Sequence, residues 1–196
     1  MNENRKATIE RETAETKIRV ELCLDGAGRS EPSTGIGFLD HLLDALARHA
    51  RFDLRLECAG DLEVDDHHTA EDCALALGAA IDEALGDRAG IARFGSAYAP
   101  LDEALARAVV DLSGRPCAEV ELGLVGDRLG TLSTQNVEHV IRSLATTSRS
   151  TIHVDVLRGR NDHHRSEAAF KALALALRRA VARDGGADVP STKGVL

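Results

Sequence analysis

An internal repeat is the feature of this sequence that most restricts its fold. Residues 40–47 read DHLLDALA and residues 138–145 read EHVIRSLA. Further along, residues 66–71 read DHHTAE and residues 162–167 read DHHRSE. The two motifs recur in the same order and at nearly equal separation, which indicates duplication of one unit. The chain is therefore expected to fold as two similar halves.

Each copy shows the same expected order of strand, helix, strand and helix. Apolar residues recur at every second position in the strand segments and at three- and four-residue intervals in the helical ones. Asp66 and Asp162 precede the last helix of each copy and are expected to act as its N-cap. The predicted strands are 15–26, 52–58, 115–126 and 151–157, and the predicted helices are 38–46, 73–85, 137–144 and 170–181. These elements predict an α+β fold class with an internal duplication of two halves, each a sheet plus two helices.

The domain limits follow from this pattern. The first half is placed at residues 1–88 and the second at residues 89–184. Residues 185–196 lack periodicity and are expected to form a C-terminal tail that is mobile unless something binds it.

Composition argues against two classes of partner. The net charge is −8 and aromatic residues make up 3% of the chain, which disfavours nucleic acid. No apolar run reaches the 18 residues of a membrane span, so no membrane association is expected. The four cysteines form no C-x-x-C pair, and the first residues are polar rather than a secretory signal. A cytoplasmic location is predicted.

The repeated motifs also have the spacing of metal ligands. His67 and Glu71 are four residues apart, which places an imidazole and a carboxylate on one face of a helix. His163 and Glu167 repeat this spacing. Such histidines can also cap helices or pair with carboxylates, but packing alone does not require six of eight histidines at repeat-equivalent positions. The predicted metal ligands are His41, His67, His68, Glu71, His139, His163, His164 and Glu167.

Helix geometry suggests how these ligands are shared between two ions. Adjacent helical residues point about 100° apart, so the two histidines of each HH pair are expected to bind different ions. One ion is assigned to His67, Glu71, His163 and Glu167, and the other to His41, His68, His139 and His164. Four protein ligands leave two open positions on an octahedral ion. A nitrogen and oxygen ligand set suits several divalent metals, and octahedral geometry with carboxylates favours Mn²⁺.

With these motifs in hand, the sequence resembles the imidazoleglycerol-phosphate dehydratases of histidine biosynthesis in their monofunctional form. The resemblance spans residues 7–196 and adds the motifs PLDEAL at 100–105, DLSGRP at 111–116 and PSTKGVL at 190–196. It implies the ribosomal protein S5 domain 2-like fold, two Mn²⁺ ions per active site, and a homo-oligomer of 24 subunits that share ligands. It further implies that the C-terminal tail of residues 185–196 binds substrate.

The resemblance also implies the reaction, which is dehydration of D-erythro-imidazole-glycerol phosphate to imidazole-acetol phosphate. The two manganese ions would bind the substrate imidazole as imidazolate, which expels the hydroxyl next to the ring. It assigns the proton-transfer base to Glu15, places Asp102 near substrate hydroxyls, and gives the phosphate to Arg93, Arg115, Lys171, Ser191 and Lys193. Asp102 could instead be an acid at a helix N-terminus. The spacing of Lys171, four residues after Glu167, links phosphate and metal binding without the resemblance.

Two other functions fit the ligand pattern. A dinuclear metallohydrolase would also use two ions with open positions. A metal-storage or metal-stabilised assembly protein is the non-enzyme alternative, and six imidazoles suit it less well than carboxylates would.

Overall fold

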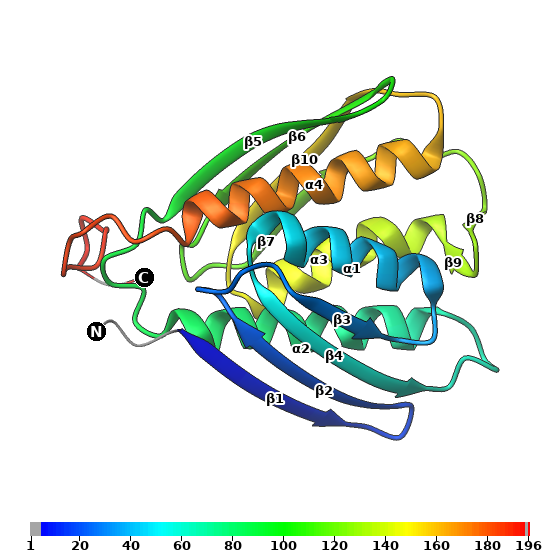
Figure 1. Cartoon of the computed structure of the whole chain (residues 1–196), viewed down its shortest axis with the longest axis horizontal. Coiled ribbons are helices and arrows are strands. Elements are labelled where there is room, and N and C mark those ends of the chain that lie inside the picture. The colour runs from blue at the N-terminus through cyan, green and yellow to red at the C-terminus, as the bar shows by residue number, and fades with distance from the viewer. Residues whose placement is uncertain (1–4, 195) are drawn as a thin grey trace.

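The computed structural model describes residues 5–194 and 196, which form two four-stranded sheets, a short hairpin and four helices. Figure 1 shows the elements in chain order. They are β1 (Lys6–Glu12), β2 (Thr16–Cys23), β3 (Ser30–Ser33), α1 (Gly37–Ala50), β4 (Asp53–Gly60), α2 (His67–Leu85), β5 (Phe94–Leu101), β6 (Ala104–Asp111), β7 (Cys117–Glu121), β8 (Arg128–Leu129), β9 (Leu132–Ser133), α3 (Thr134–Thr147), β10 (Thr151–Arg158) and α4 (Asp162–Ala180).

The two sheets have the same topology. The first has the strand order β1-β2-β4-β3 and the second the order β5-β6-β10-β7. In each sheet the last strand of the list is parallel to its neighbour and the other pairs are antiparallel. The predicted α+β duplication is therefore confirmed, with β10 matching β4, α3 matching α1 and α4 matching α2.

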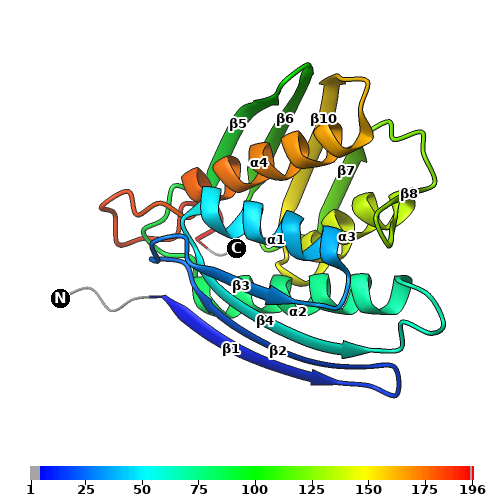
Figure 2. The same ribbon diagram turned by 45° about the vertical axis from the view of Figure 1, so that its right-hand side comes forward.

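All four helices lie between the two sheets (Figures 1 and 2). Helix α2 packs on the first sheet and α4 on the second, whereas α1 packs against α4 and α3 against α2. The first helix of each half therefore covers the last helix of the other half. This exchange is what brings side chains from the two repeats together.

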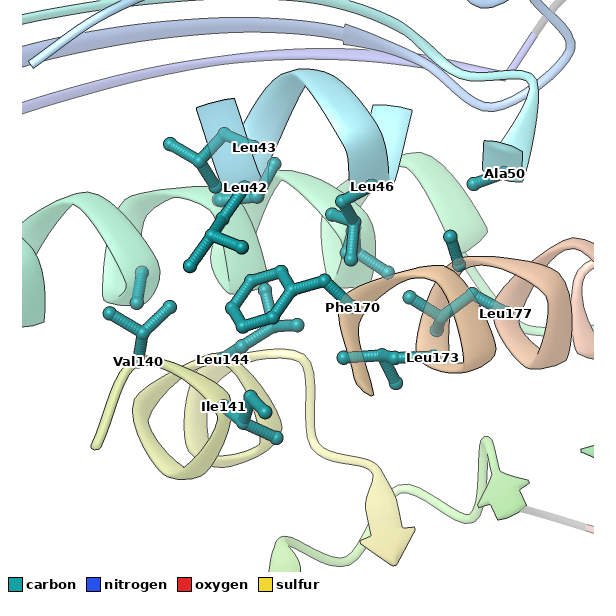
Figure 3. Packing of buried hydrophobic residues seen from close by; sticks show 14 of the residues in the cluster. Leu42, Leu43, Leu46, Ala50, Val140, Ile141, Leu144, Phe170, Leu173 and Leu177 are labelled. Atoms are coloured by element: carbon teal, nitrogen blue, oxygen red, sulfur yellow. The ribbon is translucent and has the colours of Figure 1, made fainter. Parts of the chain in front are cut away.

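The helices share one hydrophobic core, and Phe170 of α4 lies near its centre (Figure 3). Its ring is buried between side chains from α1 and α3 as well as from its own helix. Burying a side chain of this size stabilises a fold by about 1.5–3 kcal/mol. Figure 3 labels other members of the same cluster, among them Leu42, Leu43, Leu46, Val140, Leu144 and Leu173. Because both halves supply this core, neither half buries its apolar surface alone.

The structure corrects the predicted equivalence of the segments 15–26 and 115–126. Helices form at all four predicted helical segments, and strands form at 52–58 and 151–157. The segments 15–26 and 115–126 also contain strands, but these strands do not occupy equivalent places in the two sheets. The strand in the first segment is antiparallel to β4, whereas β7 is parallel to β10 and matches β3. Alternating burial identifies a half-buried strand but not its place in a sheet.

Six strands of the described residues were absent from the prediction, namely β1, β3, β5, β6, β8 and β9. The buried positions of β5 and β6 are mostly small, as at Gly95, Ala97, Ala106 and Ala108. A Cβ on Gly95 would lie 2.0 Å from the carbonyl oxygen of Ala176, so α4 packs too closely for a larger residue. Rows of Gly and Ala give a weak hydrophobic alternation, which is why the pattern missed β5 and β6.

The predicted N-caps were wrong. Asp66 lies at the N-cap position of α2 but its side chain forms no cap hydrogen bond. It accepts instead from the backbone N–H and hydroxyl of Ser133 and from the amide of Asn136 in the other half. Helix α4 is capped by Asn161, one residue before the predicted Asp162. The aspartates of both DHH motifs therefore serve contacts outside their own helix.

Two further expectations concern the ends of the halves and membranes. Helix α2 ends at Leu85 and β5 begins at Phe94, and the limits at 88 and 184 stay predictions. Among residues 5–194 and 196, no helix combines the length and the apolar character that crossing a membrane requires.

Candidate active site

Two clusters of potential metal donors lie at the N-terminal ends of the four helices. Cluster A consists of His41 on α1 with His163 and Glu167 on α4. The Nε2 atoms of His41 and His163 lie 3.0 and 3.2 Å from the same carboxylate oxygen, Oε2 of Glu167. The three donor atoms lie within 4.8 Å of one another, a spacing at which one cation could be bound by all three.

Cluster B is the repeat-equivalent set, His67 and Glu71 on α2 with His139 on α3. The Nε2 atom of His139 lies 3.1 Å from Oε1 of Glu71, and that of His67 lies 4.0 Å from Oε2. The rings of His67 and His139 are stacked with centroids 4.8 Å apart. Within each predicted i,i+4 pair the histidine and the glutamate therefore belong to one cluster, as their spacing required.

Within one chain the donors group differently from the two predicted sets of four; the sequence leaves the assignment of these sets to subunits open, so they stay a prediction. His67 and Glu71 do not meet His163 and Glu167, and His41 and His139 fall in different clusters. The reason is the exchange of helices, because α1 packs on α4 and α3 on α2. Each cluster consequently draws one histidine from one half and a histidine and a glutamate from the other.

The second histidine of each HH pair points away from its neighbour, as the helical step predicts. His68 donates from Nδ1 toward Oδ2 of Asp61 at 3.0 Å, and its Nε2 lies 3.6 Å from Oε1 of Glu15. His164 has Nδ1 at 2.7 Å from Oε2 of Glu103 and Nε2 at 3.9 Å from Oδ2 of Asp102. In both cases one carboxylate is bonded to Nδ1 and another stands beside Nε2.

These contacts change the protonation of the groups. The hydrogen bond to Asp61 raises the pKa of His68, and the bond to Glu103 raises the pKa of His164. The same bond, together with the backbone N–H groups of Arg160 and Asn161, lowers the pKa of Glu103 to about 2. Glu103 is therefore ionised and can only accept hydrogen bonds at neutral pH.

The predicted phosphate ligand Lys171 lies beside cluster A, with its Nζ 2.6 Å from Oε1 of Glu167. Burial opposes the charge of this carboxylate, but hydrogen bonds from Lys171 and His41 outweigh burial and lower the pKa of Glu167 to about 2. The position on α2 that matches Lys171 is Leu75. The two clusters therefore differ in charge although their donors match.

A second difference lies three residues before each lone histidine. Phe38 occupies this position in α1, and its ring lies edge-on to His163 at 5.0 Å between centroids. Asn136 occupies it in α3, and its Oδ1 lies 3.0 Å from Nδ1 of His67 while its amide donates to Asp66. The i,i+3 spacing to His139 was a signal that could have identified Asn136.

Glu15 and Asp102 both lie in turns and not in regular elements. Glu15 is in the turn between β1 and β2, and Asp102 is in the turn between β5 and β6 with a φ of 45°. The alternative of Asp102 as an acid at a helix N-terminus is therefore wrong. Sequence reasoning missed the adjacent Glu103 and the loop residue Asp61, because turn residues carry no periodic signal.

The remaining predicted substrate ligands lie elsewhere. Arg93 pairs through Nε and Nη2 with the carboxylate of Asp111, and its Nη1 donates to the carbonyl oxygen of Pro190 at 2.7 Å. The carboxylate of Asp111 raises the pKa of this guanidinium. Arg115 donates to the carbonyl oxygen of Ser113 at 3.3 Å. Both arginines are thus engaged by the protein in a single chain.

The tail residues Ser191 and Lys193 follow α4 at its C-terminal end, whereas cluster A lies at the N-terminal end of α4 and cluster B at the N-terminal ends of α2 and α3 (Figure 1). The 19 residues of this helix extend about 28 Å at 1.5 Å per residue. Ser191 Oγ accepts from the backbone N–H of Lys193, which closes a local turn. The structure therefore does not bring the predicted tail ligands to the clusters of their own chain.

Comparison with known proteins identifies the family. The family model described as imidazoleglycerol-phosphate dehydratase matches residues 34–177. The protein of that name from Eremothecium gossypii is 51% identical over the whole of both chains. A longer protein of that name from Phytophthora nicotianae is 64% identical over 98% of this chain, which spans 42% of that protein.

A solved structure agrees with the sequence comparison. The Pyrococcus furiosus enzyme, in complex with (S)-C348, has a TM-score of 0.83 and 38% identity over 96% of this chain and 100% of the other. Sequence and fold lead to the same result: the chain belongs to the imidazoleglycerol-phosphate dehydratase family, whose members are dehydratase enzymes of histidine biosynthesis.

Proposed function

We propose that this enzyme dehydrates D-erythro-imidazole-glycerol phosphate to imidazole-acetol phosphate and uses two Mn²⁺ ions to do so. The observation that carries the proposal is the pair of donor clusters, each with two imidazoles and a carboxylate within 4.8 Å. Nitrogen and oxygen donors without thiolate fit a divalent ion such as Mn²⁺. His41, His163 and Glu167 would bind one ion, and His67, Glu71 and His139 the other.

The metal supplies what the substrate lacks. No carbonyl group acidifies the carbon that must lose a proton, so activation has to come through the imidazole ring, and bound Mn²⁺ would lower the pKa of that ring. The protein residues hold the ions and the proton acceptor in place. Glu15 is the proposed base, since its carboxylate stands beside Nε2 of His68, which is the proposed fourth imidazole of a neighbouring chain's site.

A complete site is proposed to combine residues of several chains. Each cluster offers three donors, whereas the two remaining predicted ligands, His68 and His164, lie outside the clusters of their own chain. The tail with Ser191 and Lys193 also lies at the far end of α4. Both observations support a homo-oligomer in which a neighbour supplies the fourth imidazole and the phosphate ligands, in line with the predicted 24-subunit assembly. A cytoplasmic location stays a prediction.

The direct test of the function is turnover with defined metal content. Purified protein is stripped with chelator, reloaded with Mn²⁺ and assayed for imidazole-acetol phosphate, while elemental analysis counts bound metal. We expect turnover only after reloading, with two ions per chain. Release of inorganic phosphate instead would indicate a metallohydrolase. Metal binding without any turnover would indicate storage and would contradict the dehydratase proposal.

Sharing between chains has its own test. The variants His41→Ala and His68→Ala are each expected to be inactive, because each lacks one ligand of every shared site. When the two are dissociated, mixed and reassembled, sites with cluster A from one variant and His68 from the other would be intact. Recovery of activity in the mixture supports sharing, and its absence in mixed assemblies contradicts it.

A further inference from the structure

The two repeat-equivalent histidines outside the clusters make the same contact through different means. His68 and His164 each have a carboxylate oxygen on Nδ1, at 3.0 and 2.7 Å. The carboxylate on His68 belongs to Asp61, directly after β4, whereas that on His164 belongs to Glu103, in the turn between β5 and β6. Since β4 matches β10 and not the hairpin β5-β6, duplication of one unit does not explain both contacts.

We propose that Asp61 and Glu103 are positioning residues that keep the Nδ1 proton on His68 and His164 and so leave Nε2 as the metal-binding atom. The inference rests on the proposed function, in which these histidines complete the metal sites. An ionised carboxylate only accepts, so Nδ1 must donate, and a neutral imidazole then carries its lone pair on Nε2. Carboxylate partners of this kind orient metal-binding imidazoles and increase their basicity.

Backbone groups fix both residues, Glu103 through its carboxylate and Asp61 through its main chain, while Oδ1 of Asp61 has no hydrogen-bond partner among the described residues. The second oxygen of Glu103, Oε1, accepts from the N–H groups of Arg160 and Asn161, both at 3.0 Å, at the start of α4. Asp61 is held in its loop because its N–H donates to the carbonyl oxygen of Glu15 at 3.1 Å and its carbonyl accepts from Val64 at 2.8 Å. The imidazole rings are therefore aligned by segments that the fold already places.

The contact on His67 follows the same rule with a neutral acceptor. Its Nδ1 faces Oδ1 of Asn136 at 3.0 Å, and the amide nitrogen of that side chain donates to Asp66. Because the amide nitrogen is turned to Asp66, the amide oxygen faces the imidazole of His67, and this again requires the proton on Nδ1. Orientation of Nε2 by an oxygen on Nδ1 is thus a repeated feature of this site and not an incidental surface ion pair, which would contribute little.

The test is Mn²⁺ binding, measured from the electron paramagnetic resonance signal of free Mn²⁺ during titration of stripped protein. Asp61→Ala and Glu103→Ala are expected to weaken binding of Mn²⁺ about 10- to 100-fold. Asp61→Asn and Glu103→Gln keep an acceptor oxygen and should recover part of the loss. Glu119→Gln, an exposed carboxylate on β7, is the matched control and should bind as wild type.

The thermal midpoint of the metal-free variants separates positioning from a purely structural role. Positioning predicts weak Mn²⁺ binding with a wild-type midpoint, and recovery of kcat at saturating Mn²⁺. If the wild type binds two Mn²⁺ ions and the variants bind Mn²⁺ equally tightly, the inference is overturned and the proposed function stays intact. Loss of binding that tracks a lower metal-free midpoint, even in the Asn and Gln variants, also overturns it. A wild type that binds no Mn²⁺ refutes the proposed function itself.

Discussion

Clusters A and B contain the same three donors at repeat-equivalent positions, but the residues around them differ. Cluster A has Lys171 on its carboxylate and the ring of Phe38 against His163. Cluster B has Leu75 and Asn136 at the matching positions, and Asn136 is hydrogen-bonded to Nδ1 of His67. Duplication kept the donors and allowed their surroundings to change. The comparison shows that matching donors do not make two candidate metal sites equivalent.

The largest expected effect tests whether the clusters are separate. His163→Ala removes a donor from cluster A and His67→Ala removes one from cluster B. Each should lower bound Mn²⁺ from two ions to one per chain and decrease kcat at least about a thousandfold, because one ion no longer stabilises developing charge. Elemental analysis and steady-state kinetics check this. Loss of both ions from either variant would mean that the clusters form one cooperative site.

The next effect tests the contribution of Asn136. Asn136→Ala removes the acceptor on Nδ1 of His67 and should weaken one of the two Mn²⁺ affinities about 10- to 100-fold. Phe38→Ala is the matched change in cluster A, where no hydrogen bond is lost, and should alter affinity much less. Calorimetric titration of stripped protein measures both. Equal losses in the two variants would remove the distinction between the clusters.

A smaller effect is expected at Lys171, which is 20% exposed. Its ammonium competes with a cation for Glu167, so Lys171→Leu, which reproduces Leu75, should tighten one Mn²⁺ site two- to fivefold, about 0.5–1 kcal/mol. If Lys171 also binds the phosphate, KM should increase in the same variant. Leu75→Lys should weaken the other site. An unchanged affinity in both variants would show that charge near the carboxylate has no influence.

The smallest effect is on the stability of the fold and comes from an ion pair far from both clusters. It should leave the difference between clusters A and B unchanged. Arg5 donates to the carboxylate of Asp25 through its backbone and guanidinium, which lowers the pKa of Asp25. A depressed carboxylate pKa stabilises the fold above the unfolded value of about 3.9, and the stabilisation is lost as pH falls below it. We expect about 1 kcal/mol, measured by urea unfolding between pH 6 and 3, with less pH dependence in Asp25→Asn. A change in Mn²⁺ affinity in that variant would contradict the separation of the two regions.

The sequence predicted the donors better than their arrangement. The i,i+4 pairs on α2 and α4 follow from helical geometry, which depends only on local sequence. Which lone histidine joins which pair depends on α1 packing against α4, a tertiary contact that no repeat or period encodes. The same limit applies to Asp61 and Glu103, because turns place them. In the sheets, rows of Gly and Ala in β5 and β6 hid two strands whose close packing on α4 required small residues.

The exchange of helices has a consequence for the origin of this chain. A half-length ancestor with only one repeat would have held a lone histidine on its first helix and an imidazole and carboxylate on its second, facing apart. It could have formed a metal site only by pairing with another copy of itself, and the pair would have had two identical sites. Fusion of the two copies into one gene would have released each site to acquire its own neighbours. On this view Lys171 and Asn136 record divergence that a symmetric dimer could not have allowed, because a change in one of its sites would have appeared in both.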